Sequence, residues 1–505
     1  MSVSSQPISW NVPATTLSTV GVNASDPRVS MDASGDIVAV WVENGVVKAN
    51  SKLVNGNWGT VASISGSNAS LPKVVSDSNG NSTAIWLENG VVKASSKTLA
   101  GSWSAAASLS ANGASAPVLA IDSAGNVIAG WTTSTSLQTS QKPVGGNWTA
   151  KVTINSPGIS PSLALGGAGS NTTAAIVWHE LVSGVTVIKA STKLFSGSWG
   201  TPVVLSNANM NAAYTQVAVD ASSDVTAIWY QYTNPAYTNV VLQSSNKPFS
   251  AAWTTPVNLS KPGIRNPANL TSGLAFDGYG NTVAVWTNSF DDEIIYVQSS
   301  TKGLNNSWSN PVDIASGSLY SHSENLSVST FGNAVTVFMF YNGLDLIIQS
   351  SESDISGFVN DDWSLPINIS QGSYNGSPRV VSSVSSNALQ VAAVWLSSNL
   401  TTNSVQATTG KKSMILPPTN LSVTQSSNNF GVFTEYYNTL TWQASADPNT
   451  IGYIIYRNGQ YLTQVPANTL QIIDDNRAQN GSVKYGIAAI DRENAHSQIV
   501  NISFP

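Results

Sequence analysis

The stretch that decides the fold is DPRVSMDASGDIVAVWVENGVVKANSKLVNGNWGTVASIS, residues 26–65, because the next forty residues repeat its pattern. The second copy reads LPKVVSDSNGNSTAIWLENGVVKASSKTLAGSWSAAASLS, residues 71–110. Alignment on the aromatic residue after the apolar run gives eight units, 45 to 57 residues apart: Trp41, Trp86, Trp131, Trp178, Trp229, Trp286, Phe338 and Trp395. A regular period of this length is typical of a repeat architecture.

Each unit contains four short runs rich in β-branched residues, separated by turn residues, which predicts four antiparallel strands. The turn between the first two runs reads DASGD, DSNGN, DSAGN or DGYGN. An Asp side chain can cap such a turn, and Gly accepts its positive φ. Four strands in each unit at this period indicate an all-β protein with an eight-bladed β-propeller.

The beginning of the chain resembles the end of a unit. ISWNVPATTLS (8–18) resembles GSWGTPVVLS (197–206) and AAWTTPVNLS (251–260), which each close a unit, whereas the eighth unit stops at SVQATTG (404–410). We therefore expect the N-terminal segment to supply the outermost strand of the eighth unit, which closes the ring and removes an exposed edge. The predicted propeller spans residues 1–412.

A different pattern begins after the last unit. The segments LTW ending at Trp442, GYIIYRNG (452–459) and VKYGIAAID (483–491) match a fibronectin type III module in order. In such a module a core Trp lies on the second strand, and Tyr485 would take the place of the tyrosine corner. We predict this domain for residues 413–505, as a spacer or adhesive unit.

The propeller region resembles the sialidase-like propellers with Asp-box repeats found in bacterial secreted and surface proteins. The Asp-Gly turn here lies between the first and second strands, whereas in that family it lies between the third and fourth. The resemblance implies an extracellular or cell-surface location. A sialidase also needs three arginines that bind its ligand's carboxylate, a Tyr–Glu pair and an Asp, and Arg28, Arg265 and Arg379 do not stand in those motifs.

The composition excludes several classes of protein. Charged residues make up 10% of the chain and the formal net charge is −6, which does not fit a nucleic-acid surface. There is no cysteine, and no apolar run is long enough to span a membrane. No signal peptide stands in this numbering. We expect no cofactor and no metal site, although the acidic residues 291–293 could hold calcium.

Alternation along the first strand of each unit predicts a first candidate site. One position, on the same face as a column of small residues, holds Arg28, Lys73, Val118, Ser162, Gln216, Gly273, Asn325 and Arg379. The first, second and eighth units become neighbours when the ring closes, so Arg28, Lys73 and Arg379 should form a basic arc at the channel mouth. Three cations would suit a carboxylate or sulfate. Alternatively, they are solvated strand ends.

Long loops in units five to seven predict a second candidate site. The loops on one rim are longer at residues 230–240, 261–273, 288–294 and 315–327 than in the first units. Binding residues often lie on loops held by a rigid scaffold, although loop length also drifts freely. The candidates on this rim are Tyr232, Tyr237, Arg265, Asp291, Asp292, Glu293, Tyr320, His322 and Glu324.

The sequence favours a monomeric, lectin-like binding protein that recognises glycans, including acidic sugars, or surface proteins, and that is not an enzyme. The first alternative is a sialidase-like, glycoside-active enzyme, for which the rim carboxylates could supply the two facing acids that glycosidases need. The second alternative is a purely structural surface component.

Overall fold

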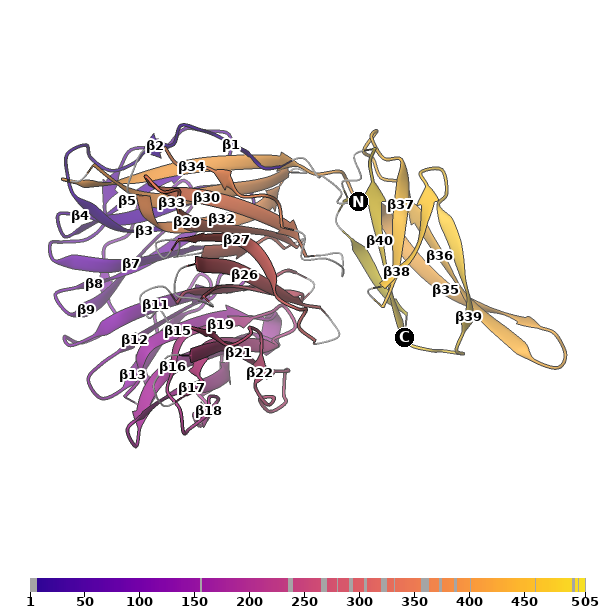
Figure 1. Ribbon diagram of the computed structural model, residues 1–505, viewed down its shortest axis with the longest axis horizontal. Helices are drawn as coiled ribbons and strands as arrows, with labels where there is room; N and C mark the ends of the chain where they lie inside the picture. Colours follow the sequence, from indigo (N-terminus) through magenta and orange to yellow (C-terminus); the bar gives the residue numbers. More distant parts are fainter. Residues whose placement is uncertain are drawn as a thin grey trace.

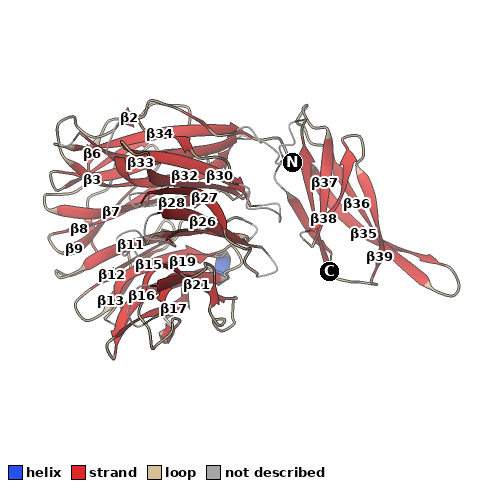
Figure 2. Ribbon diagram, viewed as in Figure 1, coloured by secondary structure: helices blue, strands red, loops and turns tan. Residues whose placement is uncertain are grey.

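The computed structural model describes the chain outside residues 1–6, 155–156, 235–238, 265–269, 279, 290–293, 304–306, 319–324, 331, 356–362, 372–374, 386–387, 400, 459, 493–495, 498 and 505. The described residues are strands, turns and loops, with one short 3-10 helix, η1 (Gly169–Asn171) (Figure 2). The predicted all-β class is therefore confirmed. Figure 1 shows the strands as two bodies, with the C-terminal one in yellow.

The described part of residues 7–413 forms eight antiparallel sheets, and the first four follow the chain. Their strands are β3 (Ala24–Met31), β4 (Ile37–Glu43), β5 (Val46–Lys52) and β6 (Ala62–Ser63); β7 (Ala69–Ser76), β8 (Ser82–Glu88), β9 (Val91–Lys97) and β10 (Ala107–Ser108); β11 (Ser115–Ile121), β12 (Val127–Thr132), β13 (Leu137–Lys142) and β14 (Val152–Ile154); and β15 (Ile159–Gly166), β16 (Thr173–Val182), β17 (Val185–Leu194) and β18 (Val203–Val204).

The other four sheets continue the same pattern. Their strands are β19 (Ala212–Val219), β20 (Val225–Tyr232), β21 (Asn239–Lys247) and β22 (Val257–Asn258), with β23 (Gly263–Ile264) beside β21; β24 (Ser272–Phe276), β25 (Thr282–Ser289), β26 (Ile294–Lys302) and β27 (Val312–Ser318); β28 (Asn325–Val328), β29 (Asn333–Tyr341), β30 (Leu346–Asp354) and β31 (Ile367–Asn368); and β32 (Asn375–Ser385), β33 (Ala388–Ser398) and β34 (Asn403–Ser413), joined by β1 (Ser9–Trp10) and β2 (Thr15–Thr16).

The first strands of the sheets contact one another in sequence order. β3 contacts β7, and the contacts continue through β11, β15, β19, β24 and β28 to β32, which contacts β3 again. The order of neighbours thus returns to its starting strand, and the arrangement is propeller-like.

The N-terminal segment pairs with the last sheet. β1 and β2 are antiparallel to β34, with Ser9 opposite Lys411, Trp10 opposite Gly410 and Thr15 opposite Ala407. The predicted pairing of residues 8–18 with the final unit is confirmed. Gly410 is needed for this pairing, because a Cβ there would stand 2.5 Å from Ile8 Cγ2 and 3.0 Å from the Trp10 ring.

Two repeated features hold the sheets together. The aromatic residues of the first column, Trp41 to Trp395 with Phe338, are fully buried between sheets. In the turn between the first two strands, Asp32 Oδ1 accepts hydrogen bonds from the backbone N–H groups of Ser34 and Asp36, both at 2.8 Å. The same capping recurs at Asp77, Asp122 and Asp220. Both roles agree with the sequence patterns.

The C-terminal body has two sheets with a common core. One contains β35 (Thr419–Asn429), β36 (Thr434–Gln443) and β39 (Gln471–Arg477); the other contains β37 (Gly452–Arg457), β38 (Gln460–Pro466), β40 (Val483–Ile490) and β41 (Val500–Phe504). Trp442 packs edge-on against Tyr453, with ring centroids 5.6 Å apart. The Tyr485 hydroxyl donates to the Asp474 carboxylate and accepts from Asn438, so it bonds side chains rather than the backbone bonded in a tyrosine corner.

In the described residues no helix is long and apolar enough to cross a membrane.

The first prediction concerns the pairing of the two chain ends. Deletion of residues 1–18 leaves the outer edge of β34 unpaired and uncovers the apolar side chains that Ile8 and Leu17 contact. We expect the truncated chain to aggregate or to unfold at a much lower temperature, because an exposed edge and an open core both favour association. Size-exclusion chromatography and thermal unfolding measure this.

A point substitution gives a milder form of the same test. Gly410→Ala forces β1 away from β34 and should destabilise the protein by about 1–3 kcal/mol through overpacking. Gly56→Ala is the matched control, because the nearest atom to a Cβ there is at 3.4 Å. Equal stability of the deletion variant and the full chain would contradict the pairing.

Candidate functional site

A β-bulge recurs at one level of the inner strands. In β3 the pairing with β4 shifts between Ser25 and Arg28, and the equivalent shift occurs in β7, β11, β15, β19 and β32. The bulged residue has a left-handed φ of 45–54° in all six strands: Asp26, Leu71, Ala116, Ser160, Tyr214 and Ser377. A bulge twists its strand and re-aims the side chain that follows.

The side chains just after the bulge meet the neighbouring inner strand. Ser162 Oγ lies 3.5 Å from Gln216 Oε1 and accepts a hydrogen bond from the backbone of Val217 at 3.2 Å. At the aligned repeat position of β28, Asn325 Oδ1 accepts a hydrogen bond from the backbone N–H of Val380 at 2.8 Å. The column containing Arg28 therefore lies where the inner strands face one another.

Arg28, Lys73 and Arg379, which we call the inner cation cluster, stand at this level on β3, β7 and β32. All three are partly buried. Burial, followed by the charges of Arg28 and Arg379, lowers the pKa of Lys73 to about 7. Burial and the charge of Arg28 lower the pKa of Arg379 to about 9. The structure thus brings the three residues of the predicted arc within electrostatic range of one another.

The cations of this cluster have few partners. Arg28 Nη1 donates to the carbonyl oxygen of Pro27 at 2.8 Å, and Arg379 Nη1 donates to that of Pro378 at 2.6 Å. Lys73 makes no hydrogen bond with the described residues, and none of the three forms an ion pair with them. Guanidinium and ammonium donors therefore remain available to an anion.

Asp26 is the carboxylate that acts on the cluster. Its charge raises the pKa of Arg28, Lys73 and Arg379, against the larger effect of burial. Sequence alignment alone missed this residue, although the segments DPR, LPK and SPR place a proline directly before each cation and mark the bulge.

Of the nine candidates for the second predicted site, Tyr232 is the one that lies among the described residues. Tyr232, the last residue of β20, is 8% exposed and packs in a core cluster with Val240 and Leu270. Its ring is therefore part of the core rather than of an open rim. The other rim candidates lie outside the described residues: Tyr237, Arg265, Asp291, Asp292, Glu293, Tyr320, His322 and Glu324.

Comparisons with known proteins give no family by sequence. No protein-family model matches the chain, and no curated protein matches its sequence. Among solved structures, an ulvan lyase is 9% identical, with a TM-score of 0.43, over 66% of this chain and 92% of its own. An α-L-arabinanase from Penicillium chrysogenum is 8% identical, with a TM-score of 0.33, over 49% of this chain and 92% of its own.

A lectin from Aleuria aurantia is 12% identical, with a TM-score of 0.33, over 60% of this chain and 97% of its own. At these identities the likeness is one of fold. The neighbours are mostly carbohydrate-active enzymes, which contradicts the predicted non-enzymatic binding protein. The first alternative, a sialidase-like, glycoside-active enzyme, agrees with them better.

The pKa of Lys73 leads to a prediction about stability. Folding lowers this pKa from 10.5 to about 7, so between these values the unfolded chain holds one more proton than the folded chain. The contribution of Lys73 to the free energy of unfolding therefore rises with pH across this window. Below about pH 7 Lys73 is protonated in both states, and it then destabilises the folded chain to the full extent. We expect Lys73→Met to raise the melting temperature by a few degrees at about pH 6, and by less as the pH approaches 10.

Lys48→Met is the control for this measurement, because Lys48 donates to Ser63 on β6 and lies outside the cluster. Thermal unfolding of both variants and the parent across the pH range gives the comparison. A Lys73→Met effect that is independent of pH would show that folding does not lower the pKa of Lys73.

Proposed function

We propose that the chain is an extracellular enzyme that cleaves acidic glycans at the inner cation cluster. In this proposal, residues 1–412 form an eight-bladed β-propeller and residues 413–505 a fibronectin type III module that acts as a spacer. The observation that carries the proposal is the convergence of Arg28, Lys73 and Arg379 from neighbouring inner strands. Apart from one bond from each guanidinium to the preceding proline carbonyl, their donors have no acceptor among the described residues.

The strand order supports the two domain assignments. Eight sheets whose first strands contact one another in a closed order are the arrangement of propeller blades. The sheets β35–β36–β39 and β38–β37–β40–β41 correspond to the three-stranded and four-stranded sheets of a fibronectin-like sandwich. No partner chain is needed to assemble the cluster, so we propose that the enzyme acts as a monomer.

The cluster suits a sugar that carries a carboxylate. Arg28 and Arg379 would bind the carboxylate of a uronate residue through charge-assisted hydrogen bonds, which guanidinium groups make in bidentate form. Neutralising the carboxylate also makes the hydrogen on the adjacent carbon more acidic. The Arg pair would thus both select an acidic sugar and activate it.

In this proposal Lys73 acts as the base. A lysine whose pKa lies near 7 is partly neutral at physiological pH and can accept a proton. In the proposed β-elimination, Lys73 Nζ removes the proton from the carbon next to the carboxylate. The electron pair of that C–H bond forms a C=C bond, the glycosidic C–O bond breaks, and water or the Lys73 ammonium protonates the leaving oxygen.

Elimination fits the described residues better than hydrolysis does. Glycoside hydrolysis needs two carboxyl groups about 5–10 Å apart, one on each side of the bond. Among the described residues, Asp26 is the carboxylate that influences the cluster, and no second one accompanies it. A cation pair with a neutral amine is instead the set of groups that proton abstraction beside a carboxylate requires.

The test is cleavage of uronate-containing polysaccharides, followed by the ultraviolet absorbance of the unsaturated sugar that elimination creates. We expect activity on an acidic polysaccharide and none on a neutral arabinan. Lys73→Met should lower kcat by about 10²- to 10⁴-fold, as loss of a general base does. Arg379→Ala should raise KM and lower kcat, because the carboxylate is bound in both the ground state and the transition state.

The pH profile separates the two roles of the cluster. kcat should rise as the pH passes about 7 and Lys73 loses its proton, while affinity for the acidic substrate falls. Lys48→Met should behave like the parent. New reducing ends without absorbance would indicate hydrolysis, and absence of cleavage of any acidic or neutral glycan would refute the proposed enzyme.

A further inference from the structure

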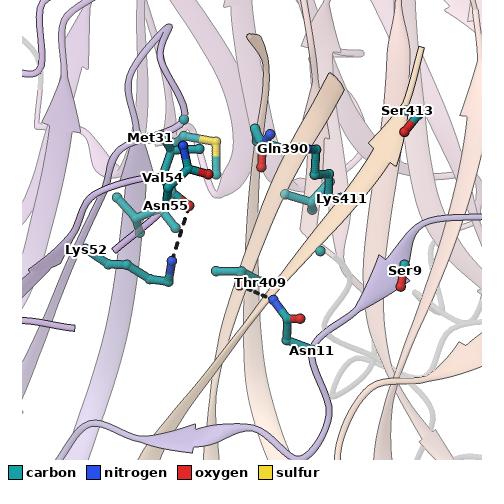
Figure 3. A pocket seen from close by; sticks show the side chains of 14 residues that line it. Ser9, Asn11, Met31, Lys52, Val54, Asn55, Gln390, Thr409, Lys411 and Ser413 are labelled. Atoms are coloured by element: carbon teal, nitrogen blue, oxygen red, sulfur yellow. Dashed lines mark hydrogen bonds between the residues drawn. The ribbon is translucent and has the colours of Figure 1, made fainter. Parts of the chain in front are cut away.

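A polar cavity lies between the first and last sheets (Figure 3). Its volume is about 400 Å³. The first sheet supplies Met31, Gly35, Ile37, Lys52, Val54 and Asn55. The last sheet, with the N-terminal segment, supplies Ser9, Asn11, Gln390, Val391, Thr409, Gly410, Lys411 and Ser413. We call this space the seam cavity, because the two ends of the ring meet there.

The seam cavity and the inner cation cluster are separate. The cluster follows the bulge near the start of β3, whereas the cavity is reached at Met31, the last residue of that strand, and at the turn after it. No residue of the cluster lines the cavity. A ligand in the cavity would therefore occupy a site of its own.

One side of the cavity is a regular polar face of the last sheet. Alternate residues of a strand point to the same face, so Thr409, Lys411 and Ser413 on β34 belong together. Ser9 pairs with Lys411 and lies beside them, as does Gln390 of β33. At the other end of the same seam the contact is apolar, through Leu17, Trp41 and Val405. Polar side chains thus replace apolar packing where the cavity opens.

One lysine position bridges neighbouring sheets at Lys193 and Lys302 but contacts its own loop at Lys52, as it also does at Lys97, where Nζ donates to the Leu99 carbonyl at 3.4 Å. Lys193 donates to Gln141 of the preceding sheet at 2.6 Å, and Lys302 donates to Asn246 of the preceding sheet at 3.0 Å. Lys52 holds the equivalent position in the first sheet, and its equivalent partner in the last sheet is Thr409.

At the seam, Lys52 and Thr409 form hydrogen bonds with other groups and not with each other. Thr409 Oγ1 accepts from Asn11 Nδ2 at 2.8 Å, and Lys52 Nζ approaches the carbonyl oxygens of Leu53 and Val54 at 3.3 and 3.5 Å (Figure 3). The ammonium group is therefore held by long contacts to its own loop, beside an open space rather than against a sheet.

The chemistry of the lining indicates the type of ligand. Two lysines, three carboxamides and several hydroxyls surround the space, and none of the described lining residues is acidic. The charge of Asp36 raises the pKa of Lys52, against the larger effect of burial. Asp36 Oδ1 also accepts a hydrogen bond from the backbone N–H of Val54. Met31, Ile37 and Val54 add an apolar wall. Hydroxyl-bonding amides, an apolar wall and cations are together suited to an acidic sugar.

We propose that the seam cavity binds one acidic saccharide unit, whose carboxylate or sulfate lies against Lys52 and Lys411. A volume of about 400 Å³ is near the lower limit of ligand pockets, which fits one or two sugar rings. Because the ligand contacts the first and last sheets together, its binding also stabilises the closed arrangement. The proposal does not depend on the catalytic activity proposed above.

The experiment uses the full chain with Arg28→Ala and Arg379→Ala, so that the inner cation cluster cannot bind the probe. The probes are a glucuronate disaccharide, a glucose sulfate and the neutral disaccharide cellobiose, followed by saturation-transfer NMR and by the melting temperature. We expect binding of one or both acidic probes, a rise in melting temperature, and no response to cellobiose. The two acidic probes distinguish a carboxylate site from a sulfate site.

Variants then assign the binding to the seam. Lys52→Met and Gln390→Ala should each lower the affinity for the acidic probe by at least about tenfold, while Lys52→Arg should keep the affinity of the parent. The matched control is Lys97→Met, at the equivalent position of the second sheet and outside the cavity. Melting without ligand shows whether each variant is folded. Absence of binding by both acidic probes, or equal loss in Lys97→Met, would overturn the proposal.

Discussion

The pairing of β1 and β2 with β34 is the constraint on which the rest of the structure depends. It joins residues almost four hundred positions apart and gives the last sheet its outer edge. Two consequences follow for chemistry. β32 comes to lie beside β3, which sets Arg379 next to Arg28. The same meeting of the chain ends creates the seam cavity, since its lining comes from both sides of the seam.

The inner cation cluster has an electrostatic cost that the fold does not remove. Burial and like charge both act against the protonated Lys73, and Asp26 offsets them only in part. At the same level other strands carry Ser162, Gln216 and Asn325, which form ordinary hydrogen bonds between strands. The scaffold therefore does not need cations here. Perturbed groups of this kind gather at functional sites, which is why we propose a catalytic role for the cluster.

The bulge beneath the cluster is a repeated feature rather than a local defect. Among the described residues it occurs in six inner strands, each with one residue in the same left-handed conformation, and three of these strands carry a cation after it. The backbone geometry is thus common to the scaffold, and the side chain chosen at each repeat decides what the level can bind. This separation between a fixed frame and variable side chains explains how propeller-like folds support different functions.

Much of this protein could be determined from its sequence alone. The repeat, the buried Trp column, the Asp-capped turns and the pairing of the two chain ends all follow from short-range patterns that recur at a fixed period. Equivalence of Arg28, Lys73 and Arg379 also followed, because aligned repeats place equivalent residues at the same level. Tertiary structure decided what periodicity does not encode. The bulge brought Asp26 to the cluster, Tyr232 turned into the core, and the seam cavity formed where the first and last sheets meet. These outcomes depend on contacts between sheets, and a repeat pattern describes each sheet separately.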